Sequence, residues 1–193
     1  MNYLVHLYLS DPTPECRLGN LMGDFVKGRL EDAWAPEILR GIRQHRRVDA
    51  FAHRSAVFRR SKARIHDSFG HCKGVLVDVF YDHFLARNWI RYSTVPLDLF
   101  ARDIYRLLEE NRKILPPGLQ EVAPRMIAHN WLVSYRETQT IGRVLDRISE
   151  RLSRPNPIAL GIGELHRHYD GLQADCDLFL AEAEKFLRDG QAE

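Results

Sequence analysis

The segment RGIRQHRRVDAFAH, residues 40–53, decides the fold class because it has the composition of a helix, and no Gly or Pro interrupts it after Gly41. Positions 38, 42, 45, 49 and 52 follow one helical stripe, and two of these five positions hold His45 and Asp49. Side chains four residues apart on a helix lie one above the other, with about 5–6 Å between their Cβ atoms. A polar pair on a buried face costs free energy unless it is satisfied. The stripe therefore predicts either a mutual hydrogen bond or a bound metal ion.

A second segment, VLVDVFYDHFLARNW at residues 75–89, is a strongly apolar helix that contains Asp78, Asp82 and His83. Asp78 and Asp82 stand four residues apart on a face shared with apolar side chains. Like charges at this spacing repel, and burial in a low dielectric strengthens the repulsion. A cation between the carboxylates, or a proton on one of them, removes the conflict.

Together the two segments supply two imidazoles and three carboxylates, a ligand set suited to manganese, magnesium, iron or zinc. Two structural alternatives stay open. His45 and Asp49 are also typical of a satisfied core pair, and Arg46 or Arg47 could neutralise the two aspartates in a salt-bridge network.

The composition is that of a globular protein, with 45% hydrophobic and 28% charged residues over 193 positions. We expect a single helical domain over residues 1–193, with a C-terminal helix at 160–193 packed on it. Three cysteines without a CxxC pair favour a reducing compartment, and no signal peptide or apolar run of about 18 residues is visible. These features predict a cytoplasmic protein.

Positive charge is concentrated in one block, although the net charge of the chain is only +2. Residues 40–64 contain eight Arg and one Lys against the single acid Asp49, a local charge of +8, so the other residues sum to −6. Such a block indicates an anionic partner: phosphate, nucleic acid or an acidic protein. A solvated helix face whose arginines pair with acids elsewhere is the structural alternative.

Periodicity, capping residues and breakers predict an all-α fold. Thr13 and Pro14 are typical of an N-cap and a first helical residue, and no hairpin signal separates two strand-like runs. The expected helices cover residues 2–9, 14–26, 36–53, 55–65, 72–92, 93–114, 119–135, 138–152 and 160–188.

If a metal ion binds these residues, the chemistry follows from its charge. A divalent ion with open positions activates water and polarises a phosphoryl oxygen. Arg46 and Arg47 are suited to hold a phosphate, and Asp49 or Asp78 is a candidate general base. The reaction class that this predicts is phosphoester hydrolysis.

Four separated motifs in this order resemble bacterial acyl carrier protein phosphodiesterase, also called holo-ACP hydrolase. They are MNYLVHLYLSDPTPE…GNLMGDFVKG, IRQHRRVDAF, DVFYDHFLARNW and NWLVSYR, and the likeness runs from residue 1 to about 150. It implies a single-domain helical bundle similar to the HD phosphohydrolases and a dependence on a divalent metal, with Mn²⁺ preferred. It also implies hydrolysis of the phosphodiester that joins 4′-phosphopantetheine to a serine of holo-acyl carrier protein.

The resemblance adds His6 and Asp24 to the candidate site, because both lie in its first motif. The implied metal ligands are His6, Asp24, His45, Asp78, Asp82 and His83. The implied catalytic residues are Asp24, Asp49, Arg46 and Arg47. The chain departs from the HD pattern in having Asp82–His83 where that superfamily has His–Asp.

Because acyl carrier proteins are strongly acidic, the resemblance also gives the basic block a partner. The expected docking residues are Arg43, Arg54, Arg59, Arg60, Lys62 and Arg64. Two other functions stay open: an HD-type hydrolase of nucleotides or cyclic dinucleotides, and a helical module that binds RNA or protein without catalysis. The basic block has few interleaved aromatic residues, which makes stacking recognition of RNA poor.

Overall fold

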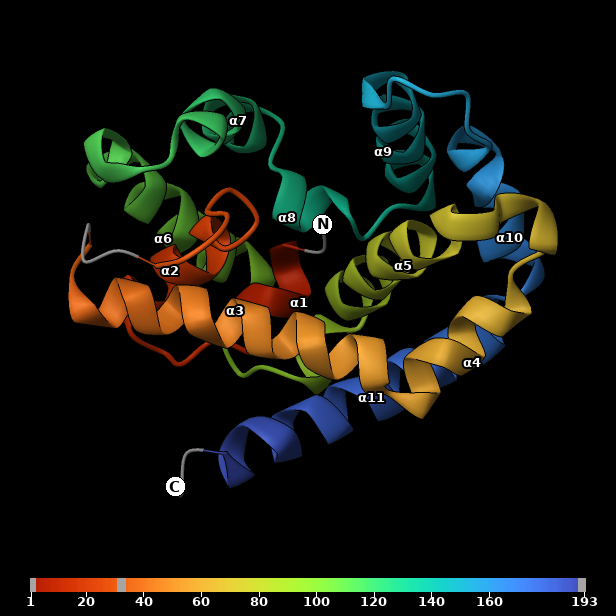
Figure 1. Ribbon diagram of the computed structural model, residues 1–193, viewed down its shortest axis with the longest axis horizontal. Coiled ribbons are helices and arrows are strands. Elements are labelled where there is room, and N and C mark those ends of the chain that lie inside the picture. The colour runs from red at the N-terminus through yellow and green to blue at the C-terminus, as the bar shows by residue number, and fades with distance from the viewer. Residues whose placement is uncertain (1–2, 31–33, 191–193) are drawn as a thin grey trace. The chain divides into compact units, whose positions relative to one another are not determined.

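The computed structural model describes residues 3–30 and 34–190, and in these ranges it contains helices and no β-strand. The predicted all-α fold is therefore confirmed. The α-helices are α1 (Tyr3–Tyr8), α2 (Pro14–Met22), α3 (Pro36–Arg54), α4 (Ala56–Arg64), α5 (Lys73–Arg87), α6 (Leu97–Glu110), α7 (Pro117–Ala128), α8 (Trp131–Ser134), α9 (Thr138–Arg151), α10 (Ile162–Arg167) and α11 (Tyr169–Asp189) (Figure 1). Four 3₁₀ turns accompany them: η1 (Asp67–Cys72), η2 (Trp89–Arg91), η3 (Arg112–Ile114) and η4 (Ile158–Gly161).

The chain divides into two compact units, each built from two separated stretches of sequence. Among the described residues, unit 1 consists of 51–87 and 135–190, and unit 2 consists of 3–30, 34–50 and 88–134. The expected single domain and the HD-like architecture stay predictions. The last three positions of the expected 160–193 segment lie outside the described residues.

In unit 2, α2 begins where the sequence predicts it. Thr13 is the N-cap, and its hydroxyl oxygen accepts a hydrogen bond from the Cys16 amide at 3.3 Å. The helix ends at Met22 rather than at the expected Val26, and the Gly23 amide closes its last turn by donating to Asn20 O at 3.2 Å. The segment that carries Asp24 therefore follows the helix as a turn.

Glycines let α2 and α3 approach each other closely. A Cβ atom added to Gly19 would lie 2.1 Å from the carbonyl oxygen of Ile38, and one added to Gly41 would lie 2.1 Å from that of Cys16. Real Cβ atoms do not come this near to backbone, so only glycine fits at these two positions. The contact fixes the depth at which α3 packs on α2.

The expected helix over 119–135 is two helices, because the chain turns at Asn130. This residue has a φ of 45°, in the left-handed region that Asn tolerates better than most side chains. The Tyr105 hydroxyl donates to Asn130 Oδ1 at 3.0 Å and accepts from the Leu132 amide at 3.0 Å. One buried hydroxyl on α6 thus holds both sides of the break between α7 and α8.

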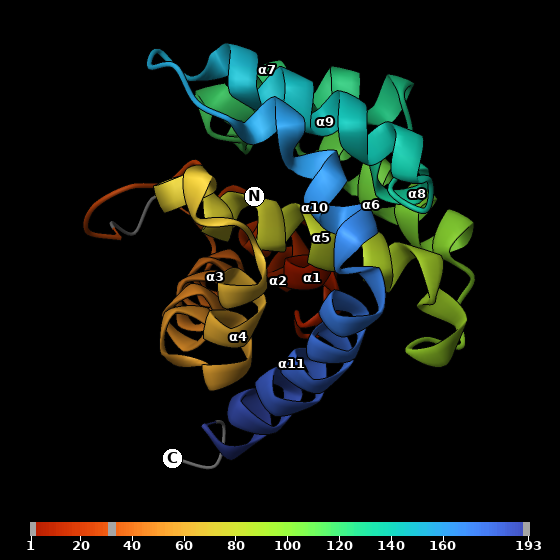
Figure 2. The ribbon, with the colours of Figure 1, turned by 90° about the vertical axis from the view of Figure 1, so that its right-hand side faces the viewer.

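Unit 1 is organised around aromatic side chains from α4, α5 and α11. The ring centroid of Phe179 lies 5.9 Å from that of Phe58 and 5.3 Å from that of Tyr81, and all three side chains are buried. Helices α4 and α11 lie side by side in both views (Figures 1 and 2). Ser55 caps α4 by accepting a hydrogen bond from the Phe58 amide at 3.2 Å.

Further helix boundaries differ from the expectation. The expected helix over 93–114 is α6, which ends at Glu110, followed by η3. Helix α5 ends at Arg87, and the chain continues as η2 where the prediction extended the helix to 92. The expected helix over 160–188 is three pieces, η4, α10 and α11, with a non-helical His168 between the last two. In the described part of the chain, every helix is too short or too polar to cross a lipid bilayer.

Candidate metal centre

Two buried histidines of unit 2 lie face to face, one from α1 and one from α3. The rings of His6 and His45 are stacked, with centroids 3.7 Å apart and planes inclined by 15°. Their residues are 4% and 3% exposed, so neither imidazole is open to bulk water. His6 is placed by the short apolar helix α1, and His45 by the buried stripe of α3.

Asp49 joins the two imidazoles through its two carboxylate oxygens. Oδ1 lies 3.2 Å from His6 Nε2, and Oδ2 lies 3.4 Å from His45 Nε2. The predicted pairing of His45 with Asp49 is confirmed. The Asp49 side chain is 52% exposed, although the sequence predicted it to be buried. The cluster therefore has a buried imidazole side and a carboxylate side that is open to solvent.

Asp24 supplies a second carboxylate from the turn after α2. Its Oδ1 lies 3.6 Å from His45 Nε2, and its side chain is 25% exposed. The structure therefore brings together His6, Asp24, His45 and Asp49, which lie on three separate parts of the sequence. Periodicity paired only the last two, and the resemblance supplied the others.

Arg46 is bound to backbone carbonyls in this structure, and its predicted phosphate contact stays a prediction. Its two terminal nitrogens donate to the carbonyl oxygens of Gly28 and Val26, each at 2.9 Å. The guanidinium thereby fastens the turn that carries Asp24 to α3. Arg47, the other predicted phosphate contact, is half-buried on the same helix, and its role stays a prediction.

Donor atoms of the cluster fit a divalent cation. One nitrogen each of His6 and His45 and one oxygen of Asp49 lie within 4.8 Å of one another. The Nδ1 atoms of both histidines are buried and have no hydrogen-bond partner among the described residues. Buried polar atoms are rarely left unpaired. Two imidazoles with one or two carboxylates are a donor set suited to Mn²⁺, Fe²⁺ or Zn²⁺.

The electrostatics of the cluster follow from these contacts. Burial favours the neutral imidazole and lowers the pKa of His6, despite its contact with Asp49. Burial acts in the same direction on His45, but its contacts with Asp24 and Asp49 outweigh it and raise the pKa to about 9. Burial would raise the pKa of both carboxyls, yet the histidine contacts hold both below the usual range. The two carboxylates are therefore charged at neutral pH and attract a cation.

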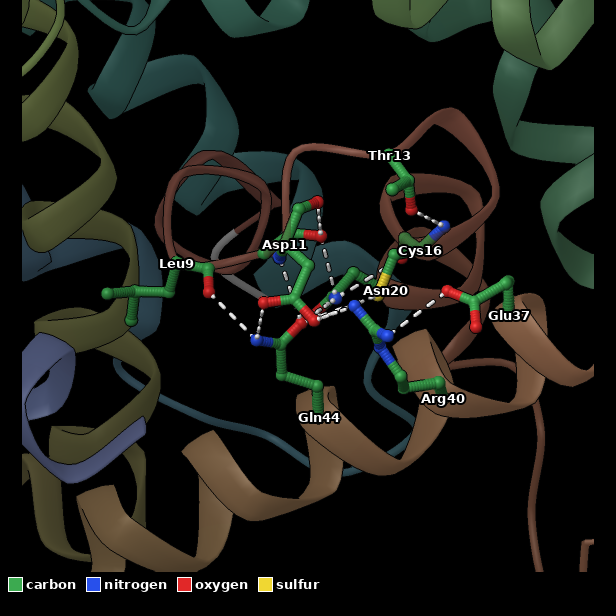
Figure 3. A network of polar contacts seen from close by, with 9 residues as sticks. Leu9, Asp11, Thr13, Cys16, Asn20, Glu37, Arg40 and Gln44 are labelled. Carbon is green, nitrogen blue, oxygen red and sulfur yellow. Dashed lines mark hydrogen bonds and ion pairs between the residues drawn. The ribbon is translucent and has the colours of Figure 1, made fainter. Parts of the chain in front are cut away.

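A polar network around Gln44 holds the helices that carry the cluster (Figure 3). The Gln44 amide nitrogen donates to Leu9 O at 3.2 Å, and its oxygen accepts from the Asp11 amide at 3.2 Å and from Asn20 Nδ2 at 3.1 Å. Arg40, one turn earlier on α3, pairs with the Asp11 carboxylate. One buried amide next to His45 thus ties the end of α1 and the last turn of α2 to α3.

Three predicted ligands, Asp78, Asp82 and His83, lie on α5 in unit 1. Asp82 and His83 are fully buried, and Asp78 is half-buried. His83 Nδ1 donates to Tyr135 O at 2.8 Å, and His83 Nε2 accepts from the Tyr169 hydroxyl at 2.9 Å. A metal ion could reach His83 only by displacing one of these partners, which favours a structural role for this histidine. The ligand roles of the two aspartates stay predictions.

Two arginines of the basic block pair with a buried acid. Arg60 Nη2 and Arg64 Nε lie 2.6 and 2.8 Å from the carboxylate of Asp175, which is buried on α11. These two arginines neutralise an internal acid, as the structural alternative proposed. Arg43, Arg54 and Arg59 are exposed, whereas Lys62 is half-buried with its amine 5.7 Å from the Phe58 ring centroid.

Sequence reasoning missed Gln44, the loop-fastening role of Arg46 and the acid at Asp175. Gln44 had a readable signal, since it stands between Gly41 and Val48 at helical spacing on the inner side of α3. Asp175 had none, because its partners are more than 100 positions away in sequence.

Two stacked imidazoles and two carboxylates, one of them open to solvent, give this all-α chain a donor set that a divalent cation could occupy. The model of the family described as acyl carrier protein phosphodiesterase matches residues 1–183, and the chain belongs to this family.

Curated relatives carry the same description. The chain is 32% identical to the acyl carrier protein phosphodiesterase of Pectobacterium atrosepticum over 88% of each chain. It is 29% identical to that of Serratia proteamaculans over 99% of this chain and 100% of the relative. It is 30% identical to that of an Escherichia coli strain over 90% of each chain. No solved structure matches the chain.

Proposed function

We propose that this protein is a metal-dependent phosphodiesterase that removes 4′-phosphopantetheine from holo-acyl carrier protein. The observation that carries the proposal is the cluster of His6, His45 and Asp49, in which two buried imidazoles meet a half-exposed carboxylate. The family and the printed names of the relatives supply the substrate.

Three residues are the proposed ligands: His6, His45 and Asp49. The two buried histidines supply nitrogen donors that are held rigid by their stacking, and Asp49 supplies oxygen at the exposed side. A divalent ion bound there, Mn²⁺ by the family resemblance, would lower the pKa of bound water and polarise a phosphoryl oxygen.

Asp24 is the proposed general base. Its carboxylate reaches the cluster at His45 but stands outside the group of three whose donor atoms lie within 4.8 Å of one another. Oδ1 of Asp24 takes the proton of the attacking water. The water oxygen forms a bond to phosphorus, and the bond between phosphorus and the serine oxygen breaks. The serine oxygen takes a proton from solvent, Asp24 returns its proton to solvent, and the products are apo-acyl carrier protein and 4′-phosphopantetheine.

Docking of the carrier protein is proposed for the exposed arginines of the basic block. Arg54 and Arg59 are exposed around the start of α4, and Arg43 is exposed on α3. Arg60 and Arg64 are left out of this surface because both pair with Asp175. Exposed arginines attract an acidic protein and speed its encounter more than they strengthen the final complex.

The deciding experiment follows the mass of holo-acyl carrier protein during incubation with the purified protein. With Mn²⁺ we expect loss of the 4′-phosphopantetheine mass, and with EDTA we expect none. The His6→Ala variant should be inactive, whereas Gln120→Ala, a change on α7, should retain activity. An unchanged carrier protein, together with hydrolysis of nucleotides or cyclic dinucleotides in the same buffer, would overturn the proposal.

A further inference from the structure

Gly23 lies directly against His45, at the place where α2 ends. A Cβ atom added to Gly23 would lie 2.3 Å from Cγ, 2.6 Å from Cδ2 and 2.7 Å from Cβ of His45. Real Cβ atoms essentially never come within 3.0 Å of such neighbours. Any side chain at this position would therefore displace the histidine or the turn.

The backbone conformation of Gly23 does not require glycine. Its φ of −54° and ψ of −40° are ordinary right-handed helical values. An alanine would fit this conformation and would reduce the entropy of the unfolded chain. The need for glycine at this position is therefore a matter of space beside His45.

The spacing of the glycines explains why the contact falls on a site residue. Gly19 and Gly23 stand four apart on one side of α2, and Gly41 and His45 stand four apart on the facing side of α3. Gly19 and Gly41 bring the two backbones together, and the next turn places His45 against Gly23. The nearest atoms to Gly19 and Gly41 are backbone atoms, whereas the three nearest to Gly23 all belong to the side chain of His45.

Rotation of the imidazole cannot relieve the contact. The Cβ of His45 is one of the three crowded atoms, and its position is fixed by the backbone of α3. An alanine at 23 would have to push the turn away from α3, and the next residue in that turn is Asp24. The same turn is fastened by Arg46, which resists the shift.

We propose that Gly23 is a positioning residue of the metal centre: its missing side chain lets His45 stack on His6 while Asp24 stays in reach of His45. This inference rests on the proposed function for its catalytic consequence. Gly23 has no side chain to bind a metal or a substrate, and the role proposed for it acts through His45 and Asp24.

The first test is a double-mutant cycle that measures thermal stability and needs neither metal nor substrate. Gly23→Ala should lower the melting temperature of the full-length protein by about 5 °C, the effect of overpacking at a rigid contact. In a His45→Gly background, which removes all three crowded atoms, the same change should have no cost. A Gly23→Ala protein that folds only with His45→Gly would support the proposal in the same way. Equal destabilisation in both backgrounds would overturn it.

The second test measures Mn²⁺ binding by calorimetry and turnover of holo-acyl carrier protein. Gly23→Ala should weaken Mn²⁺ affinity by about 10- to 100-fold, because it disturbs the position of His45, a proposed metal ligand. It should also lower kcat and leave KM for the carrier protein unchanged. Gly163→Ala is the matched control, because an added Cβ there meets nothing within 4 Å. Wild-type affinity and kcat in Gly23→Ala would overturn the proposal.

The two tests separate this inference from the proposed function. A wild-type protein that binds Mn²⁺ but leaves holo-acyl carrier protein intact would refute the proposed substrate. The double-mutant cycle and the affinity of Gly23→Ala for Mn²⁺ would still decide the role of Gly23.

Discussion

The two carboxylates of the cluster stand in different relations to the histidines. Asp49 contacts both imidazoles, one with each oxygen, whereas Asp24 contacts only His45 at the longer distance of 3.6 Å. Asp49 is also the more exposed of the two. The histidine contacts support Asp49 as the ligand, because a ligand must lie among the other donor atoms, whereas a base need only reach the water.

Changing each carboxylate to its amide tests whether Asp49 is the metal ligand and Asp24 the general base. Asp49→Asn should weaken Mn²⁺ affinity by at least about 100-fold, because it removes a charged donor that joins both histidines. Asp24→Asn should keep near-normal Mn²⁺ affinity while kcat falls by about 10²- to 10⁴-fold. Calorimetry with Mn²⁺ and a mass assay of holo-acyl carrier protein give the two values. The control is Asp103→Asn, which changes a half-exposed acid on α6. Equal losses of Mn²⁺ affinity in Asp49→Asn and Asp24→Asn would contradict the assignment.

The residues of this site show what one sequence can reveal. His45 and Asp49 were predicted because they lie on one helix, where spacing determines proximity. His6 and Asp24 lie 39 and 21 positions from His45, and no periodicity joins residues on different helices. Their contact depends on how α1 and α2 pack on α3, which glycines and a buried amide determine. The resemblance to a family was the only route to them.

At the scale of elements, α1 depends on its neighbours. A helix of six residues is far too short to be stable in water by itself. Its apolar side chains are buried, and Gln44 binds the carbonyl of Leu9 and the amide of Asp11 just beyond its end (Figure 3). The position of His6 therefore depends on a residue of α3.

Gln44→Leu should destabilise the protein without changing any residue of the cluster. The substitution leaves the Leu9 carbonyl, the Asp11 amide and the Asn20 side-chain amide without this partner, at a cost of about 3 kcal/mol. Urea denaturation of the full-length chain measures the change. Gln120→Leu, which removes one hydrogen bond to Leu115 O, should cost about 1 kcal/mol. A smaller loss at Gln44 than at Gln120 would show that the network is not what holds α1.

Helix existence was predictable and helix breaks were not. The start of α2 was predicted from Thr13 and Pro14, because capping is a local property of the chain. The break at Asn130 was missed, since it depends on a hydroxyl of α6 that lies 25 positions away. Tertiary hydrogen bonds decide such boundaries, and they leave no periodic trace in the sequence.

At the scale of the whole molecule, the basic block carries less free charge than its composition indicates. Two of its arginines neutralise Asp175, and Arg46 is bound to backbone carbonyls. Arg54 and Arg59 are exposed, are not among the arginines that pair with Asp175, and both lie in unit 1.

Charge reversal at Arg54 and Arg59 together should raise KM for holo-acyl carrier protein by about tenfold and leave kcat unchanged. Steady-state assays at rising salt should show a weaker salt dependence in the variant, because screening has less attraction to remove. Arg151→Glu, an exposed change on α9, controls for net charge. A KM that rises equally in the control would place the docking surface elsewhere.

The interleaving of the two units has a consequence for synthesis on the ribosome. All four cluster residues belong to the first 50 positions, yet α6, which packs on α2, begins only at Leu97. A nascent chain that has emerged as far as Asp49 carries every side chain of the cluster without the second half of unit 2. Such a chain still exposes apolar surface. We therefore expect the cluster to reach its final packing only after α6 has left the exit tunnel, although the cluster residues are synthesised first.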